Sequence, residues 1–322
     1  MHERIVNLAL LALLAGAALS AAALSETYYI NLASRVAIIA MAASGLNFAL
    51  GYGGMVSFGH AAFFGLGGYI AGISATHAFS ATPVFGLIPA TNQMIPIWIG
   101  AVVVTALVAL VIGAISLRTR GVYFIMITLA FAQMVFYFAV SLPTYGGEDG
   151  LPIYLRNEMP LLDTSDPLRF FGICFAALAL VLFATGRITR SRFGAALTMA
   201  RLNETRLATS GIEPFPIRLT AFVISAAMTG WAGALYADLN GFVSPSMLSW
   251  HRSGELMVIV ILGGTGRLYG PLAGAMAFVA LEVLIGGVTD RWQFFLGLIL
   301  LGVVLFARGG LMGLLAGSGR HD

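Results

Sequence analysis

Apolar stretches as long as a membrane-spanning helix recur along almost the whole of this chain. A helix needs about 20 apolar residues to cross a bilayer. The eighth stretch below is too short to cross alone, so we expect it to be tilted or broken. Only 10% of the 322 residues are charged, against about a quarter in soluble domains. The chain is therefore predicted to be an all-α polytopic membrane protein with a single transmembrane domain, 1–322. We predict ten helices, near residues 5–24, 30–50, 60–79, 95–116, 121–141, 168–186, 217–237, 251–262, 270–288 and 292–308.

The basic residues predict how these helices are oriented. All 17 are arginine, and basic residues favour the cytoplasmic side of a membrane. If the amino terminus is cytoplasmic, twelve of the 17 arginines fall inside and five outside. The acidic residues have the opposite bias, because five of them share an outer loop at about 142–167. We therefore expect ten spans with both termini in the cytoplasm.

The first apolar stretch has a second interpretation. Arg4 precedes it and alanines follow it, as in a secretory signal peptide. We expect the stretch to be retained as the first membrane helix. If it were cleaved, nine spans would remain and the amino terminus would lie outside.

The composition excludes several functions for this chain. It contains no lysine, which excludes a Walker A phosphate loop and a Schiff-base enzyme. The single cysteine, Cys174, excludes an intrachain disulfide and a thiolate metal cluster. Nucleic acid is not an expected partner, because the arginines are not gathered in one patch. We expect no catalytic residue, metal site or cofactor in this chain.

A glycine-rich segment at residues 51–59 interrupts the apolar pattern. Its four glycines expose backbone groups, which are tolerated at membrane depth only inside protein or beside a watery cavity. One interpretation is a break lining a solute path, with Ser57 and His60 opening the next helix. The other is close helix packing, with Ser57 as a cap and His60 as a hydrogen-bonded buried imidazole. A protease nucleophile at Ser57 is disfavoured, because the spacing is Gly-x-x-Ser-x-Gly and His60 is only three residues away.

A similar pattern of glycines recurs, weakly, in the second half of the chain. Paired glycine breaks in two halves are typical of transporters that bind solute at a repeat interface. We therefore predict a weak repeat of two five-helix halves. Each half carries a glycine pair and two further glycines: Gly53, Gly54, Gly59 and Gly65 in the first, and Gly263, Gly264, Gly270 and Gly274 in the second.

A cytoplasmic segment at about 187–218 is the longest charged stretch and holds six arginines. Its apolar residues are spaced as in a short amphipathic helix, which Gly211 and two prolines end. Such a helix can dock in the groove of a partner protein or lie on anionic lipid. We favour docking.

Polar groups within the predicted spans are few. Glu282 is the one clear carboxylate, and it marks a polar path or a paired structural group. Arg35, near the outer end of the second span, is expected to snorkel to the surface. The glycine-rich outer segment 143–152 is expected to form a tight turn, either in a solvated loop or in contact with a substrate or an external partner.

Several distinctive motifs follow one another along the chain. They are GYGGMVSFGHAAFFG at 51–65, LRTRGVYFIMITLAF at 117–131, GGEDGL at 146–151, the stretch from FGAAL to GIE at 193–213, LTAFVISAAMTGWAGALY at 219–236, GFVSP at 241–245 and LGGTGRLYGP at 262–271. In this order they resemble the LivM-type permease subunit of the branched-chain amino-acid ATP-binding-cassette (ABC) importers. The resemblance runs from about Leu32 to Arg308.

The resemblance implies a subunit that conducts solute while its partners hydrolyse ATP. The implied partners are a second, paralogous permease, two cytoplasmic ATPase subunits that carry ATP and Mg²⁺, and a periplasmic solute-binding protein. They would assemble in the bacterial cytoplasmic (inner) membrane. The family's ATPase-coupling segment falls on Arg201, Asn203, Glu204 and Gly211. The solute path falls on Gly53, Gly54, Met55, Ser57, His60 and Phe63.

Two positions depart from the family's usual pattern. Met55 stands where glutamine is usual, and Ala195 stands where an arginine is common. The missing amide puts leucine-like specificity in doubt, so urea, short amides and aromatic acids stay open as solutes. A secondary transporter or channel is a rival function, but it would need paired intramembrane acids and would leave the cytoplasmic segment unexplained. A membrane enzyme would need clustered titratable groups, whereas Glu282 and His60 are far apart in the sequence.

Overall fold

The computed structural model describes residues 2–83, 91–154, 156–160, 162–287, 291–306 and 309–316. Arg308 and Arg320, two of the arginines assigned above to the cytoplasmic side, lie outside these ranges. The described helices are α1 His2–Ala23, α2 Thr27–Asn47, α3 His60–Phe79, α4 Met94–Ser116, α5 Val122–Val140, α6 Pro167–Thr189, α7 Arg192–Leu202, α8 Glu204–Thr209, α9 Pro214–Asn240, α10 Trp250–Gly263, α11 Gly270–Gly286, α12 Trp292–Phe306 and α13 Gly310–Ala316.

Every one of the ten predicted membrane segments corresponds to a helix in the described ranges, namely α1 to α6 and α9 to α12. Six of these are long and apolar enough to cross a membrane by length and composition: α1, α2, α4, α5, α6 and α9. The others are the glycine-rich α3 and the shorter α10, α11 and α12, of 14, 17 and 15 residues. The all-α polytopic fold is confirmed. The segment predicted to be cytoplasmic forms two short helices, α7 and α8, where one was expected, and α13 was not predicted.

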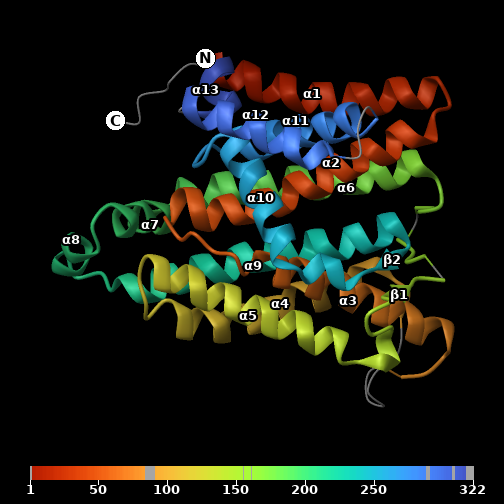
Figure 1. Ribbon diagram of the computed structural model, residues 1–322, viewed down its shortest axis with the longest axis horizontal. Helices are drawn as coiled ribbons and strands as arrows, with labels where there is room; N and C mark the ends of the chain where they lie inside the picture. Colours follow the sequence, from red (N-terminus) through yellow and green to blue (C-terminus); the bar gives the residue numbers. More distant parts are fainter. Residues whose placement is uncertain are drawn as a thin grey trace.

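The core of the bundle is built on α2 and α9. Helix α2 continues into a π-helical turn, Phe48–Tyr52. In the most apolar 18-residue stretch of this combined helix, 89% of the residues are buried, against 17% in the corresponding stretch of α1 and 22% in that of α5. Helix α9 packs against α2, α3 and α4. In Figure 1, α1 runs along one edge of the molecule and α4 and α5 along the opposite edge, with α2 and α9 between them. The peripheral helices therefore carry the apolar faces available to lipid.

Glycines allow α3 and α9 to approach closely. A Cβ atom on Gly67 would overlap the backbone of Gly230, and one on Gly233 would overlap the carbonyl of Phe64. Small residues at such crossings are how membrane helices gain packing contacts without a hydrophobic driving force between them.

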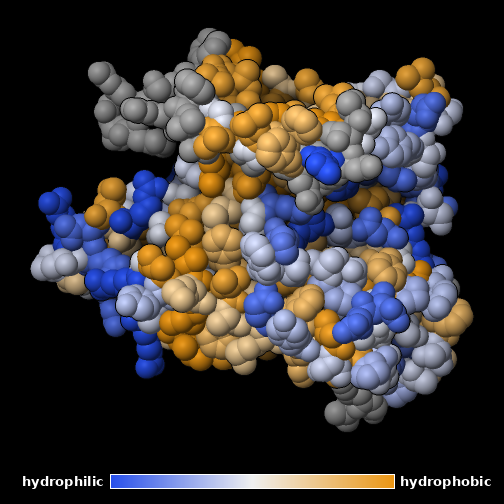
Figure 2. Space-filling view, viewed as in Figure 1, coloured by the Kyte–Doolittle hydropathy of each residue, from blue (hydrophilic) through white to orange (hydrophobic). Residues whose placement is uncertain are grey.

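The two ends of the bundle carry different structural elements. Helices α7 and α8 project beyond the long helices at one end, and a two-stranded ladder of β1 (Leu151–Pro152) and β2 (Phe242–Val243) lies at the other (Figure 1). In Figure 2, hydrophilic residues cover the α7–α8 end, a band of apolar residues lies next to it, and pale and hydrophilic residues extend from the middle of the front to the ladder end. The ladder pairs Leu151 with Val243 in antiparallel register, so the outer loop is tied to the chain that leaves α9. The predicted tight turn at 143–152 contains a 3₁₀ turn, Pro143–Tyr145, and left-handed glycines such as Gly146.

Candidate coupling site and solute path

The predicted solute-path glycines lie where α2 ends. The π-helical turn Phe48–Tyr52 leads into irregular backbone before α3 begins at His60. Gly54 has φ +67, a left-handed conformation that disfavours other residues. The side-chain stem of Arg201, on α7, lies 2.6 Å from the position a Gly54 Cβ would occupy. Arg201 Nη1 also donates a hydrogen bond to the carbonyl oxygen of Gly51. The predicted coupling segment and the predicted path are therefore in direct contact.

A buried asparagine joins this break to the second one. Asn47 Nδ2 donates to the carbonyl of Arg267 at 2.9 Å, and Asn47 Oδ1 accepts from the amide of Gly266 at 2.9 Å. Gly266 belongs to the irregular connection between α10 and α11 and has φ +76. The two predicted glycine breaks thus lie side by side. Sequence inspection missed Asn47 because its partners are some 220 residues away in the chain.

The remaining path residues are closely packed in this conformation. Met55, Ser57, His60 and Phe63 are all buried. His60 Nε2 is hydrogen-bonded to Ser225 Oγ at 2.7 Å, and its ring meets that of Phe63 edge to face. Ser57 Oγ accepts from the Gly59 amide at 3.1 Å. His60 therefore fits the packing interpretation, as a hydrogen-bonded buried imidazole. The expectation that Ser57 caps the next helix is wrong, because it bonds to Gly59 ahead of α3 and no side chain caps that helix.

Helix α10 supplies a further clamp that sequence inspection missed. Ser253 Oγ donates to the carbonyl of Phe58 at 2.6 Å and accepts from the amide of Ala61 at 2.8 Å. It thereby satisfies backbone groups on both sides of the start of α3, as buried backbone requires. No local spacing signals this role, because Ser253 lies 192 residues beyond Ala61.

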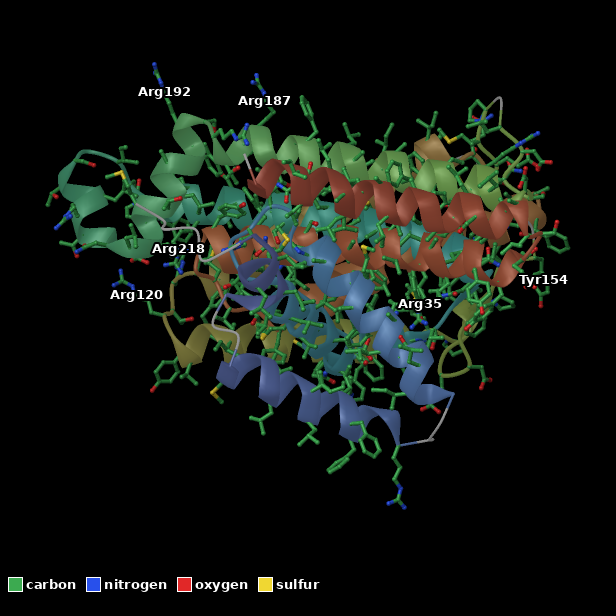
Figure 3. The ribbon with its side chains drawn as sticks, turned by 90° about the horizontal axis from the view of Figure 1, so that it is seen from above. Arg35, Arg120, Tyr154, Arg187, Arg192 and Arg218 are labelled. Carbon is green, nitrogen blue, oxygen red and sulfur yellow. The ribbon has the colours of Figure 1, made fainter. Side chains whose placement is uncertain are left out.

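The predicted coupling residues shape the α7–α8 segment (192–209). Asn203 ends α7 and caps α8, its Oδ1 accepting from the amide of Arg206 at 2.9 Å. Glu204 forms ion pairs with Arg218 in the first turns of α9 and with Arg120 after α4. Arg120 and Arg218 lie close together beside α8 in Figure 3. Gly211, with φ +85, follows the end of α8. Glu204 therefore ties the segment to α9 and to the connection between α4 and α5.

One face of this segment packs inward and another is open. Leu197 and Leu207 are buried, Leu197 beside the glycine break and Leu207 against α7. Leu202 is 73% exposed, and Met199 and, just after the segment, Ile212 are also exposed. Apolar residues appear among the hydrophilic ones at this end of the molecule in Figure 2. An exposed apolar face outside the lipid-facing helices is typical of a protein contact.

Charged groups inside the bundle are paired. Arg35 does not simply snorkel: its Nη2 contacts both Glu282 oxygens, at 2.8 and 2.9 Å, linking α2 to α11. The expectation that Glu282 is the one carboxylate in the spans is wrong. Asp238 lies within α9, which extends further than predicted, and is bonded to Asn157 at 2.6 Å. Glu255 lies in α10 and pairs with Arg252 at 2.7 Å. Among the described residues, no group of three or more His, Cys, Asp and Glu is arranged to hold a metal ion.

This arrangement defines a class of protein. Broken helices meet inside a polytopic bundle, and a charged cytoplasmic-type segment is attached to the break, as in a membrane permease. A family profile described as the permease component of branched-chain amino acid transport systems matches residues 28–305. The chain belongs to that family, and it is the transmembrane permease subunit of an ABC importer.

Individual relatives agree with this assignment. The chain is similar to the high-affinity branched-chain amino acid transport permease LivM of Salmonella typhimurium, with 28% identity over 312 residues, covering 88% of this chain and 69% of the relative. LivM of Escherichia coli is 27% identical over the same coverage. The autoinducer 2 import permease LsrC of Yersinia pseudotuberculosis is 26% identical over 167 residues, covering 49% of this chain and 46% of the relative. No solved structure matches.

Proposed function

We propose that this chain forms, with a second permease, the membrane path of an importer for branched-chain amino acids or a related small solute. Two cytoplasmic ATPases, carrying ATP and Mg²⁺, would dock on the α7–α8 segment, and a periplasmic binding protein would deliver solute to the opposite end. The LivM relatives support the solute class, and the LsrC similarity keeps other small solutes open. Hydrolysis belongs to the partners, since this chain lacks the lysine of a phosphate loop.

The observation that carries the proposal is the bond from Arg201 to the Gly51 carbonyl. Through it, and through Leu197 beside Gly53, a displacement of α7 moves the end of α2. Asn47 passes that movement to the break between α10 and α11. ATPase closure would thus shift the two breaks relative to each other. Rigid-body movement of packed elements between two arrangements is a common form of such coupling.

The orientation follows from the arginines. Arg187, Arg192, Arg120 and Arg218 all lie at the α7–α8 end of the molecule, and Tyr154 lies at the opposite end (Figure 3). By the positive-inside rule the α7–α8 end faces the cytoplasm. The start of α1 and helix α13 lie towards the same end (Figure 1), which supports the expectation of cytoplasmic termini.

Two substitutions in the assembled importer test the coupling role. Arg201→Ala removes a hydrogen bond to a charged group, worth about 1.5–3 kcal/mol, so we expect ATP-driven uptake to fall about tenfold or more. Glu204→Ala should act similarly by releasing α8 from α9. Arg192→Ala is the matched control, because Arg192 is on the same segment and projects outward (Figure 3). Subunit assembly and basal ATP hydrolysis should persist in all three variants.

The outcomes separate this proposal from its rivals. If Arg201→Ala and Arg192→Ala support equal uptake, the hydrogen bond from Arg201 to Gly51 is not the coupling route. Recovery of the tagged chain without ATPases, together with uptake that survives ATP depletion, would favour a secondary transporter or channel. In that case the α7–α8 segment would be a lipid anchor.

A further inference from the structure

A polar cavity of about 330 Å³ lies where α9 ends and α10 begins. Its size is at the lower end of the range for small-molecule sites, about 300–1,000 Å³. Its lining includes Tyr236, Asn240, Phe242, Met247, Arg252 and Glu255. None of these is among the predicted path residues, of which Met55, Ser57, His60 and Phe63 are buried elsewhere in this conformation.

The backbone places this cavity within the depth of the bundle. After Gly241 ends α9 in a left-handed conformation, the chain descends along α3 through β2 and the 3₁₀ turn Pro245–Leu248. Val243 lies beside Gly72 and Leu248 beside Gly65. Gly65 is 14 residues before the end of α3 at Phe79, or roughly 20 Å at 1.5 Å per residue. The hydrocarbon layer is about 30 Å thick, so α10 begins inside the membrane, about two-thirds of that thickness from the end of α3.

A buried guanidinium stands at the start of α10. The Arg252 side chain is 15% exposed, and its Nη1 donates to Glu255 Oε2 at 2.7 Å. Its guanidinium carbon lies 4.8 Å from the centre of the Tyr236 ring and 5.3 Å from that of Phe64. These rings hold the planar group in place by cation–π attraction. Charges at membrane depth are costly and are typical of a solute or ion pathway.

The lining matches the chemistry of an amino-acid zwitterion. A fixed guanidinium binds a carboxylate in a bidentate manner, and the Glu255 carboxylate can accept hydrogen bonds from an ammonium group. Phe242 and Met247 offer apolar surface for a side chain. In Figure 2, pale and blue residues cover the front of the molecule where α10 begins, between apolar regions.

We propose that this cavity is the solute-recognition site within the membrane, and that it binds a zwitterionic α-amino acid. Arg252 binds the carboxylate, Glu255 binds the ammonium group, and Phe242 and Met247 contact the apolar side chain. The proposal rests on the importer function above and names its solute class. It also explains how recognition reaches the glycine break: Ser253, the neighbour of Arg252, holds the Phe58 carbonyl and the Ala61 amide.

Equilibrium binding to the purified importer, without its solute-binding protein, tests the cavity. The probes are L-leucine, leucinamide, which lacks the carboxylate, and 4-methylpentanoate, which lacks the ammonium group. We expect the wild-type complex to bind leucine at least tenfold more tightly than either analogue. Arg252→Gln should weaken leucine binding at least tenfold and leucinamide binding by less than threefold. Glu255→Gln should weaken leucine binding similarly and spare 4-methylpentanoate.

The chain offers a matched control in Arg169→Gln. Arg169 and Asp166 form a pair with the same three-residue spacing, but on the surface, at 54% and 43% exposure. Arg252→Lys keeps the positive charge but loses the planar guanidinium that binds a carboxylate with two hydrogen bonds. It therefore tests the same role if Arg252→Gln does not fold. We expect it to keep assembly and still weaken leucine binding.

Failure of this proposal differs from failure of the proposed function. If leucine binds equally to wild type, Arg252→Lys, Glu255→Gln and Arg169→Gln, the cavity is not the recognition site. The importer function would still stand, because ATP-driven uptake tests it separately. Equal binding of leucine and leucinamide to wild type would overturn the zwitterion assignment. Loss of ATP dependence in wild type would overturn the importer function, while the binding comparison still decides the role of the cavity.

Discussion

Replacing Asn47 with leucine removes the bridge between the two glycine breaks. Asn47 is 2% exposed and makes one hydrogen bond to each of Gly266 and Arg267, both at 2.9 Å. Side-chain hydrogen bonds inside membrane proteins contribute about 0.6 kcal/mol each, up to about 1.7. The substitution also leaves a backbone amide and a carbonyl without this partner, which costs about 1–3 kcal/mol for a fully buried group. Since Gly266 and Arg267 are partly exposed, we expect a total loss of about 2 kcal/mol.

The assay is unfolding of the purified permease in mixed SDS micelles, followed by the fluorescence of its four tryptophans. A loss of about 2 kcal/mol corresponds to roughly a 30-fold change in the unfolding equilibrium. Ser44→Ala is the control one turn earlier in α2. Ser44 is equally buried, but its hydroxyl bonds only to Ala40 in its own helix, at 2.7 Å. We expect this control to stay within about 0.5 kcal/mol of wild type.

The reasoning is refuted if Asn47→Leu is as stable as Ser44→Ala. The bridge would then contribute nothing to holding the breaks together. A variant that is destabilised as expected but retains normal ATP-driven uptake would leave the structural role intact. It would show instead that the two breaks need not move together.

Three further substitutions probe the packing and the buried charges. Gly233→Ala should lower the free energy of unfolding by about 1–3 kcal/mol, because its Cβ would overlap the backbone of α3; Gly172→Ala, which meets open space, should be neutral. Arg35→Gln leaves Glu282 without its partner and should cost about 1–2 kcal/mol, discounted for partial exposure, and Glu282→Gln in the same chain should recover part of that loss. Met55→Gln should destabilise by about 1–3 kcal/mol through burial of an amide in an apolar cluster; if competition assays show an unchanged solute spectrum, residue 55 does not determine specificity.

The helices were predictable because their signal is local. An apolar run of about 20 residues needs no tertiary information to be identified as a membrane helix, and α4 agrees with its prediction within one residue. The predicted end of α9, at residue 237, was three residues too early: the helix continues to Asn240, and Asp238 within it accepts a hydrogen bond from Asn157. A prediction from local hydropathy cannot take account of a hydrogen-bond partner 81 residues away in the chain.

The candidate site was only partly predictable. The glycine break and the coupling segment were found as separate motifs, because each has an unusual composition. Their contact through Arg201 and Gly51 joins residues 150 apart, and nothing in either motif specifies it. The cavity beside Arg252 was missed for the same reason, since the rings that hold the guanidinium come from α3 and α9.

The sequence by itself determined the membrane-embedded helical class, the placement of the spans, the break in the second of them and the family. These depend on composition, short-range periodicity and ordered motifs. The tertiary structure alone decided which breaks touch, which charges pair and where a polar cavity remains. Those outcomes depend on helices packing in three dimensions, where hydrogen-bond partners and close glycine contacts join residues far apart in the chain.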